Sequence, residues 1–210
     1  MLTLKEKYEK NAAPEMMKKF GHKNKMAVPK IEKVILNMGV GKRISGMGGK
    51  EREKILAPIL ENLALITGQK SVLTKSHRSI SGFKVRAGAI IGSKTTLRGA
   101  KANDFLERLI NIALPRSRDF RGIEEKAVDK QGNLTIGIKE HIIFPEVSTE
   151  RAQDILSFQI TVKTTTNDRE QGLELLRLLG FPIKINKSQI PNPNEIPSIK
   201  FQTEEIFKCL

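Results

Sequence analysis

Two glycine–lysine pairs in the stretch GVGKRISGMGGKE (39–51) come closest to a catalytic motif in residue type and spacing. A phosphate-binding P-loop needs another glycine five residues before the glycine of such a pair. That position holds Leu36 for the pair Gly41-Lys42 and Ile44 for the pair Gly49-Lys50. The dinucleotide-binding pattern fails as well, because Ile44 occupies its third glycine position. These glycines therefore predict turns and loops rather than a nucleotide-binding enzyme.

The histidines and the cysteine do not form a recognisable site either. His22, His77 and His141 lie far apart, and none has a neighbour at metal-ligand spacing. The single cysteine, Cys209, is next to the C-terminus, so neither a disulfide framework nor a cysteine-rich metal site is expected. We therefore predict that the protein binds no metal ion and no other cofactor.

Carboxylates are the remaining candidates for acid–base chemistry. Glu140, Glu146 and Glu150 are close in sequence, but such groups more often form a solvated face than a catalytic pair. No nucleophile, base and oxyanion site can be assembled around them. The sequence therefore predicts a protein without catalytic activity.

The most informative feature is the stretch TKSHRSISGFKVRAGAIIGSKTTLRG (74–99), which contains six Lys and Arg residues and no acid. No acidic residue occurs in the 42 positions between Glu61 and Asp104, and the whole chain carries a net charge of +14. This excess predicts a polyanionic partner, first of all a nucleic acid. A membrane surface is less favoured, because the stretch contains no amphipathic helix with bulky apolar anchors. The alternative to a polyanion-binding stretch is a mobile basic loop that has no binding partner.

Hydroxyl and amide side chains accompany these charges. Such groups bond to phosphate oxygens and ribose hydroxyls, whereas Lys and Arg contribute the counterion-release part of binding. Gly82, Gly88 and Gly92 would allow the backbone to approach a partner closely. The hydroxyl and amide residues are Gln69, Ser71, Thr74, Ser76, Ser79, Ser81, Thr95 and Thr96.

Hydrophobic periodicity predicts the elements that must position these residues. Period-two patterns predict strands at 30–41, 70–75, 94–98, 132–144 and 157–165, and helical spacing predicts helices at 3–20, 51–67, 103–115 and 169–180. This order favours one α+β domain with two layers, in which helices pack on one face of a largely antiparallel sheet and a long basic loop projects. No internal repeat is evident.

Several local signals refine these elements. Pro14 is expected to kink or divide the first helix, and Pro115 to end the third. Asn103 is the expected N-cap of the third helix, and Asn167 or Asp168 that of the last, which Gly180 closes. Residues 43–53 are expected to form a glycine-rich loop.

The ends of the chain carry different signals. The N-terminus alternates Lys with Glu and has no apolar core segment, so it does not indicate a secretory signal. No run of about 18 apolar residues predicts a membrane-spanning helix. After Pro182 the periodicity stops, and residues 185–210 are predicted to be a proline-containing extension to a domain at 1–184.

Five ordered segments together closely resemble the bacterial or organellar form of the large-subunit ribosomal protein five family. They are VPKIEKVILNMGVG (28–41), TGQKSVLTKSHRSISGFKVRAGAIIGSKTTLRG (67–99), FLERLINIALPRSRDFRGI (105–123), GNLTIGIKEHIIFPEV (132–147) and ITVKTTTNDREQGLELLRLLGFPIK (160–184). The resemblance implies a structural constituent of the large ribosomal subunit that binds 5S ribosomal RNA in the central protuberance.

The family motifs imply a 5S RNA site around LNMGVG, GQK and TTLRG. Asn37 fits this role physically, because it faces away from Val34, Leu36 and Met38, although an asparagine that only stabilises a turn is the alternative. The 5S RNA residues implied are Asn37, Gly39, Gly41, Gln69, Lys70, Thr74, Lys75, Lys94, Thr96 and Arg98.

The segment SISGFKVRAGA (79–89) resembles the part of the family that reaches the tRNA in the peptidyl site. Phe83 is expected either to stack on a nucleotide or to pin the loop to the protein. The residues implied are Ser79, Ser81, Gly82, Phe83, Lys84 and Arg86.

A third set of residues resembles the surface that meets a protein of the small-subunit head and forms an intersubunit bridge. It comprises Arg116, Arg118, Asp119, Arg121, Glu140 and Glu146. Further partners implied are 23S-type rRNA and other central-protuberance proteins, without a membrane and without a homo-oligomer. The expected location is the cytoplasmic ribosome, with an organellar ribosome as the alternative.

Two segments depart from the family pattern. The loop around SGMGGKERE (45–53) is longer than usual, and the chain continues past Lys184. Because its charges are balanced, the extension is expected to be a strap on a protein neighbour rather than an RNA arm.

Overall fold

Five strands form one sheet in the computed structural model, which describes residues 3–44, 49–83, 85–118, 120–147 and 156–184. The strand order is β2-β3-β1-β5-β4, and every neighbouring pair is antiparallel. The strands are β1 (Ile31–Gly39), β2 (Val72–Lys75), β3 (Ile90–Leu97), β4 (Leu134–Ile138) and β5 (Phe158–Thr164). The predicted α+β fold with a largely antiparallel sheet is confirmed.

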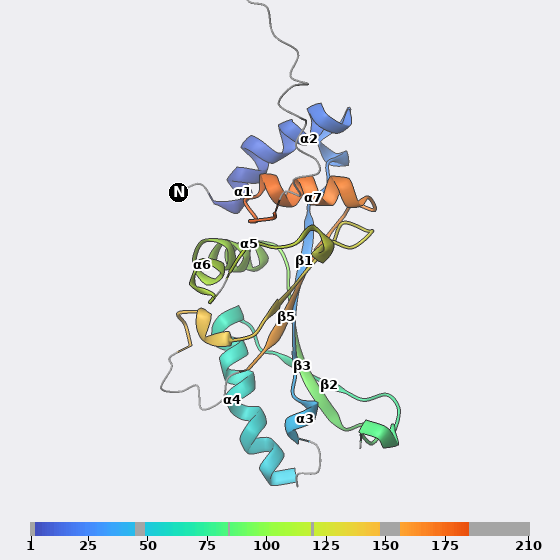
Figure 1. Cartoon of the computed structure of the whole chain (residues 1–210), viewed down its shortest axis with the longest axis vertical. Helices are drawn as coiled ribbons and strands as arrows, with labels where there is room; N and C mark the ends of the chain where they lie inside the picture. The colour runs from blue at the N-terminus through green and yellow to red at the C-terminus, as the bar shows by residue number, and fades with distance from the viewer. Residues whose placement is uncertain (1–2, 45–48, 84, 119, 148–155, 185–210) are drawn as a thin grey trace, which may run out of the picture.

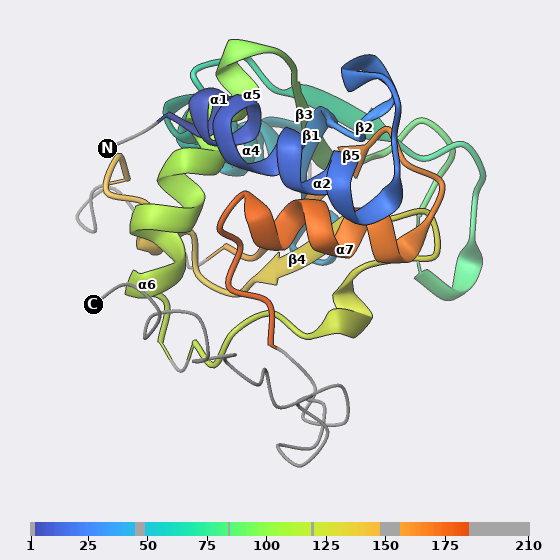
Figure 2. The ribbon, with the colours of Figure 1, turned by 90° about the horizontal axis from the view of Figure 1, so that it is seen from above.

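The helices gather on one side of this sheet and at one of its ends. In Figure 1, α4, α5 and α6 lie to the left of the strands, whereas α1, α2 and α7 pack together at the upper end, as the view from above also shows (Figure 2). The helices are α1 (Leu4–Lys7), α2 (Ala13–Phe20), α3 (Gly41–Ile44), α4 (Gly49–Thr67), α5 (Ala100–Arg108), α6 (Leu114–Arg116) and α7 (Arg169–Leu178).

Burial along the central strand β1 alternates with the two-residue period of a strand. Val34, Leu36 and Met38 are at most 1% exposed, whereas Ile35 and Asn37 between them are partly exposed. Strand β5 alternates in the same way, with buried side chains at every second position from Phe158 to Thr164. The helices therefore cover one face of the sheet, and the other face stays open.

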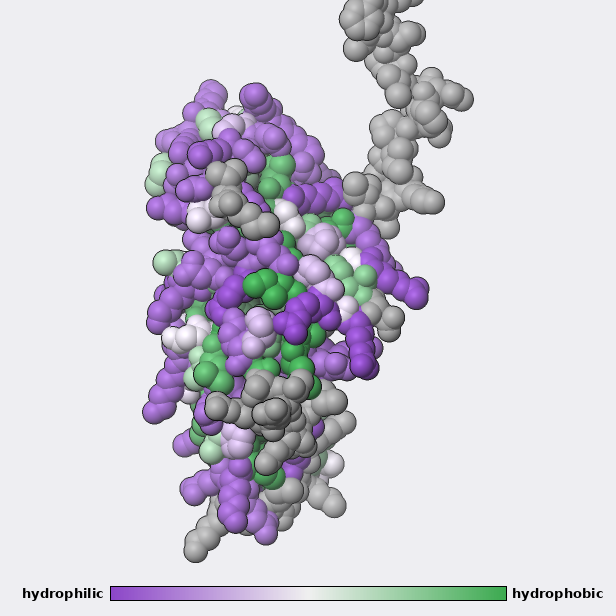
Figure 3. All heavy atoms as spheres, turned by 90° about the vertical axis from the view of Figure 1, so that its left-hand side faces the viewer, coloured by the Kyte–Doolittle hydropathy of each residue, from purple (hydrophilic) through white to green (hydrophobic). Residues whose placement is uncertain are grey.

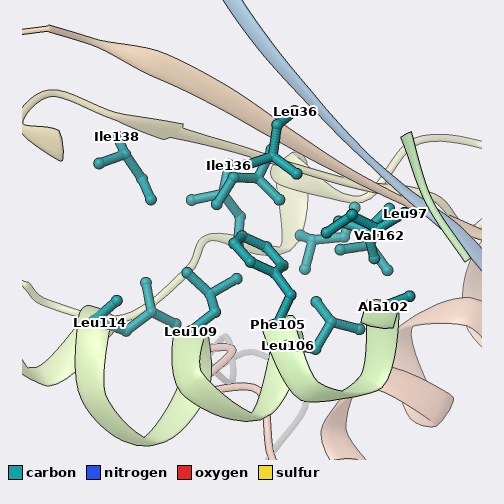
Figure 4. Close-up of a cluster of buried hydrophobic side chains, with 14 of the residues drawn as sticks. Leu36, Leu97, Ala102, Phe105, Leu106, Leu109, Leu114, Ile136, Ile138 and Val162 are labelled. Atoms are coloured by element: carbon teal, nitrogen blue, oxygen red, sulfur yellow. The ribbon is translucent and has the colours of Figure 1, made fainter. Parts of the chain in front are cut away.

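The covered face meets the helices through large apolar side chains. Phe105 of α5 is fully buried and points at the inner face of the strands, toward Leu36 and Ile136 (Figure 4). Its ring stacks on that of Phe144, with the two centroids 5.8 Å apart. Burial of one such side chain contributes about 1.5–3 kcal/mol. On the outside of this helical layer the surface is mainly hydrophilic, with smaller hydrophobic patches near the middle (Figure 3).

Two prolines that were predicted to interrupt helices are accommodated instead. The chain stays helical from Leu4 to Phe20 and from Ala100 to Arg116, through Pro14 and Pro115. In each case a five-residue π-helical segment comes just before the proline, which then occupies the first turn of the following α-helix. In these segments the Ala13 N–H donates to the Tyr8 carbonyl oxygen and the Leu114 N–H to that of Leu109. This shift of the acceptor by one residue accommodates the proline that follows, which has no N–H to donate. The prediction that Pro115 ends the third helix was wrong. Of the two alternatives for Pro14, division of the first helix is contradicted, and a kink stays a prediction.

Other element boundaries also differ from the prediction. Asn103 is not an N-cap, because α5 already begins at Ala100 and the Asn103 N–H donates to the Gly99 carbonyl oxygen at 3.3 Å. The glycine-rich stretch at 43–53 is largely helical, in α3 and in the start of α4, apart from residues 45–48, which lie outside the described residues. Strand β3 begins at Ile90 rather than at Lys94.

The strand predicted at 132–144 is shorter than expected. β4 ends at Ile138, and a 3₁₀ turn (His141–Ile143) follows the polar residues that interrupt the pattern. Of the two N-cap candidates of the last helix, Asp168 holds the position before α7, although its side chain makes no capping hydrogen bond. The predicted role of Gly180 is confirmed, since it follows the end of α7 with a φ of 97°.

Two glycines allow helix α7 to lie directly on the turn before β4. A Cβ atom on Gly172 would come within 2.4 Å of the Gly132 Cα atom and 2.6 Å of the Gly132 carbonyl oxygen. Gly132 itself has a φ of 74°, which only glycine adopts readily. The atoms that an added Cβ on Gly172 would meet belong to the backbone of Gly132, so no flexible side chain can move to make room for it.

We therefore predict that Gly172→Ala destabilises the fold, although Gly→Ala in a free helix is stabilising by up to about 1 kcal/mol. Overpacking should cost about 1–3 kcal/mol and lower the melting temperature by several degrees in a thermal unfolding experiment. The control is Glu170→Ala, at an exposed position of the same helix. An unchanged or higher melting temperature for Gly172→Ala would contradict the close packing.

Candidate nucleic-acid interface

The open face of the sheet, meaning the outward-facing residues of β1 to β5, brings together residues from distant parts of the sequence. In the antiparallel register Lys94 of β3 lies opposite Asn37 of β1, Asn37 opposite Gln159 of β5, and Gln159 opposite Gly137 of β4. Val72 of the edge strand β2 lies opposite Lys94 and is 69% exposed. One transverse row thus crosses all the strands.

A second row runs parallel to the first. Thr96 lies opposite Ile35, which in turn lies opposite Thr161, and Thr161 lies opposite Thr135. The Nε2 atom of Gln69, just before β2, donates a hydrogen bond to the Thr96 carbonyl oxygen at 3.3 Å. The structure therefore brings together Asn37, Gln69, Lys94 and Thr96, which the sequence separates by up to 59 positions.

The glycines of this face differ in what surrounds them. A Cβ atom on Gly92 would come within 2.6 Å of the Met38 carbonyl oxygen, so the fold itself requires a glycine there. Gly41 has ordinary contact distances to Ile91. By contrast, a Cβ atom on Gly39 would have no neighbour within 4 Å.

Not every hydroxyl that accompanies the basic stretch is available to a partner. Ser71 and Thr95 are 7% and 2% exposed and belong to the covered side of the sheet, as does Ser93 at 2%. Their hydroxyl oxygens have no hydrogen-bond partner among the described residues. The expectation that Ser71 and Thr95 bind phosphate or ribose was wrong, because both side chains face the covered side, Ser71 just before β2 and Thr95 within β3. Thr74 and Thr96 stay partly exposed.

Charge lies mainly at the margins of the open face. The predicted cations Lys70, Lys75 and Arg98 are exposed next to the ends of β2 and β3. At the start of β1, Glu32 lies between Lys33 and Lys163, at 3.5 Å and 3.4 Å from their ammonium groups. Desolvation alone would raise the pKa of Glu32, but the two lysines outweigh it and lower the pKa. The middle of the face is thus polar with little charge.

The residues between β2 and β3 form an ordered hairpin rather than a structureless loop. Ile80 and Val85 exchange backbone hydrogen bonds of 2.9 Å and 3.2 Å, and the Ser79 Oγ atom accepts one from the Ala87 N–H at 2.9 Å. Ser81, Gly82 and Arg86 are exposed, and Lys84 lies outside the described residues. The Phe83 side chain is 74% exposed at the tip. A side chain exposed to this extent does not pin the hairpin to the protein.

The third predicted set is only partly free to meet a partner. Arg116, Arg118 and Arg121 are exposed and Glu140 is partly exposed, whereas Asp119 lies outside the described residues. Glu146 forms an ion pair with Arg108 of α5.

Arg108 also holds the end of α4 in place, because its Nη2 atom donates to the Ile66 carbonyl oxygen at 3.1 Å. Sequence reasoning missed Arg108, since its partner is 38 residues away and no local spacing indicates the pair.

His141 follows Glu140 in the chain and lies in the core. It is fully buried, and its Nδ1 atom accepts a hydrogen bond from the Leu156 N–H at 3.2 Å. Burial lowers the pKa of His141, and the positive charge of Arg43 lowers it further. The imidazole is therefore neutral in the folded protein at neutral pH.

We predict that the free energy of unfolding decreases as the pH falls below about 6.5, the ordinary pKa of histidine. In this range the unfolded chain binds a proton at His141 that the folded chain does not, so acid favours unfolding. Protonation of Nδ1 would also remove the acceptor of the Leu156 N–H. Denaturant unfolding between pH 5 and pH 8 measures this effect.

The variant His141→Gln should lose part of this acid sensitivity, because an amide oxygen can accept the same hydrogen bond without titrating. His77→Gln, at an exposed position in the hairpin, serves as the control. Identical pH profiles for His141→Gln and the unmodified protein would contradict this account.

The described residues offer binding groups rather than groups for catalysis. No cluster of three or more His, Cys, Asp and Glu side chains that could hold a metal ion occurs among them. Within the same residues, no helix has both the length and the apolar character needed to cross a membrane. Amides, hydroxyls and lysines on an open sheet are chemically suited to contact a nucleic-acid backbone.

Comparison with known proteins points to one family. A family model described as ribosomal protein L5 matches residues 24–86, and a second model, described as the C-terminus of the same ribosomal protein family, matches residues 90–183. Proteins named large ribosomal subunit protein uL5 from Alkaliphilus metalliredigens and Clostridium botulinum are each 46% identical over 182 residues, which cover 87% of this chain and 98% of theirs. The protein of the same name from Desulforapulum autotrophicum is 48% identical over 184 residues, 88% of this chain and 99% of its own.

Proposed function

Because the chain belongs to the ribosomal protein L5 family, we propose that it binds 5S ribosomal RNA through the β2–β3–β1 half of the open face of its sheet. It is a structural constituent of the large ribosomal subunit and has no enzymatic role. The relatives named above are bacterial, which supports a cytoplasmic ribosome rather than an organellar one.

The observation that carries this proposal is the convergence of Asn37, Lys94, Thr96 and Gln69 on one outward surface. Apart from the hydrogen bond between Gln69 and the Thr96 carbonyl oxygen, these side chains face away from the helices, on the side where a partner can reach them. Amide and hydroxyl groups recognise ribose hydroxyls and base edges, and Lys94 contributes a phosphate contact.

We also propose that the hairpin between β2 and β3 contacts the tRNA in the peptidyl site. Its tip presents the exposed Phe83 ring, and Arg86, which follows the Val85 bridge, is exposed as well. An aromatic ring can stack on any base, and a guanidinium group attracts phosphate, so the tip does not depend on one tRNA sequence.

For the bridge to the small-subunit head we propose Arg116, Arg118, Arg121 and Glu140 as contact residues, with Asp119 as a further candidate. Glu146 fits a positioning role better, because its carboxylate already pairs with Arg108. Contacts with 23S-type rRNA and with other central-protuberance proteins stay predictions.

Asn37→Ala should lower the affinity for 5S RNA about tenfold, the loss expected for removing a buried hydrogen-bonding group at an interface. Lys94→Ala should lower the affinity too, and should reduce the slope of log affinity against log salt concentration by about one. Fluorescence titration across a salt series, with tRNA and an unrelated hairpin RNA as competitors, measures both.

Gln131→Ala and Lys10→Ala are the matched controls, since both positions are exposed and lie away from the open face. Equal affinity for all three RNAs, with steep loss at moderate salt, would contradict the proposal. It would mean that the basic surface binds polyanions without selection.

Phe83→Ala should weaken tRNA binding in the peptidyl site of reassembled ribosomes about tenfold or more, because stacking of one base contributes about 1–3 kcal/mol. Affinity for isolated 5S RNA should not change. The control is Met26→Ala, which removes an apolar side chain that is 83% exposed elsewhere. If the two variants hold tRNA equally well, the proposed contact does not exist.

A further inference from the structure

The fold itself does not require a glycine at position 137, in the middle of β4. Its φ lies outside the left-handed region, and a Cβ atom there would have no neighbour within 4 Å. Glycine in a strand interior weakens the strand, and it often marks a place where a ligand or another backbone approaches closely. Gly39 on β1 has the same two properties, whereas Gly92 on β3 is required by the Met38 carbonyl oxygen.

The position of Gly137 continues the row that contains Asn37. Gly137 lies opposite Gln159, and Gln159 lies opposite Asn37, so one line of residues joins the proposed RNA site to the other edge of the sheet. Thr161 and Thr135 form the corresponding part of the second row. Gln159 and Gly137 are exposed, and both threonines are partly exposed.

This half of the open face differs from the other half in its chemistry. The outward residues Gly137, Gln159, Thr135 and Thr161 are uncharged. The one cation of these two strands, Lys163 at the end of β5, lies 3.4 Å from the Glu32 carboxylate, whereas Lys75 and Lys94 of the β2–β3 half have no such carboxylate beside them among the described ion pairs. Amides and hydroxyls on a flat surface suit ribose hydroxyls and base edges, which carry no charge. Phosphates would instead call for lysine or arginine.

We propose that the β5–β4 half of the open face is a second part of the RNA site, which contacts ribose and base edges and not phosphates. Gln159 and Thr161 supply hydrogen-bonding groups, and Gly137 leaves room for the RNA backbone to come close. The inference rests on the proposed 5S RNA site and extends it across the whole sheet.

Gly137→Val tests this inference, because its effects on folding and on binding should go in opposite directions. Valine is favoured in strands and glycine is not, so the melting temperature should stay the same or rise. The added side chain would stand where the RNA approaches, so affinity for 5S RNA should fall about tenfold. The slope of log affinity against log salt concentration should not change, because no phosphate contact is lost.

Gln159→Ala provides a second, independent variant and should also lower the affinity without changing the salt slope. The control for added bulk is Ala57→Val, at an exposed position of helix α4 away from the open face. Each variant is compared by thermal unfolding and by titration with 5S RNA.

Three results would overturn the inference. Unchanged affinity in Gly137→Val and Gln159→Ala, while Asn37→Ala still weakens binding, would restrict the RNA site to the β2–β3–β1 half and leave this half to a protein neighbour. A reduced salt slope would mean that phosphates are bound here. A lower melting temperature in Gly137→Val, together with unchanged affinity in Gln159→Ala, would assign the glycine a structural role.

If the protein does not bind 5S RNA on this sheet at all, the titrations give a different result. In that case Asn37→Ala and Lys94→Ala would bind 5S RNA as well as the unmodified protein does, and the inference would fall with the proposed site.

Discussion

The packing of helical side chains against the inner face of β1 is the interaction on which the other features depend. β1 is the central strand and pairs on both sides, so its register is coupled to β3 and β5. A slip by one residue would turn every buried side chain of a strand outward. Burial of Val34, Leu36 and Met38 therefore also determines that Asn37 faces outward.

The same constraint gives the open face its division of charge. Residues in the middle of the sheet are held in register, and there the structure places amides, hydroxyls and glycines. Apart from Lys94 in the middle of β3, the cations are concentrated at the ends of strands and on the hairpin, where long side chains reach solvent. Margins of this kind attract a polyanion over a distance, whereas the mainly uncharged centre can select among RNAs by close contact.

The sequence predicts best those features that depend on local periodicity. The alternation of Val34, Leu36 and Met38 identified β1 and its buried face, and this assignment is confirmed. The prolines did not predict the helix boundaries correctly, because a π-helical segment before Pro14 and Pro115 shifts the backbone hydrogen bonding. Residue propensities do not reveal that shift.

Features that depend on residues far apart in sequence could not be predicted from local patterns. Nothing near Glu146 indicates that it pairs with Arg108, and nothing near Gly137 indicates that it continues the row of Asn37. The likeness of the five segments to a known family was sufficient to predict the family, which is confirmed. The roles of individual residues depend on cross-strand register, and that requires the three-dimensional structure.

The most direct test of the central claim is methyl NMR of the protein during titration with 5S RNA. Ile35 and Val72 report on the open face, whereas Leu65 and Ile112 are exposed on helices on the other side. The account predicts large shift changes for Ile35 and Val72 and small ones for Leu65 and Ile112. The opposite pattern would show that the RNA binds the helical side, and the proposed interface would be wrong.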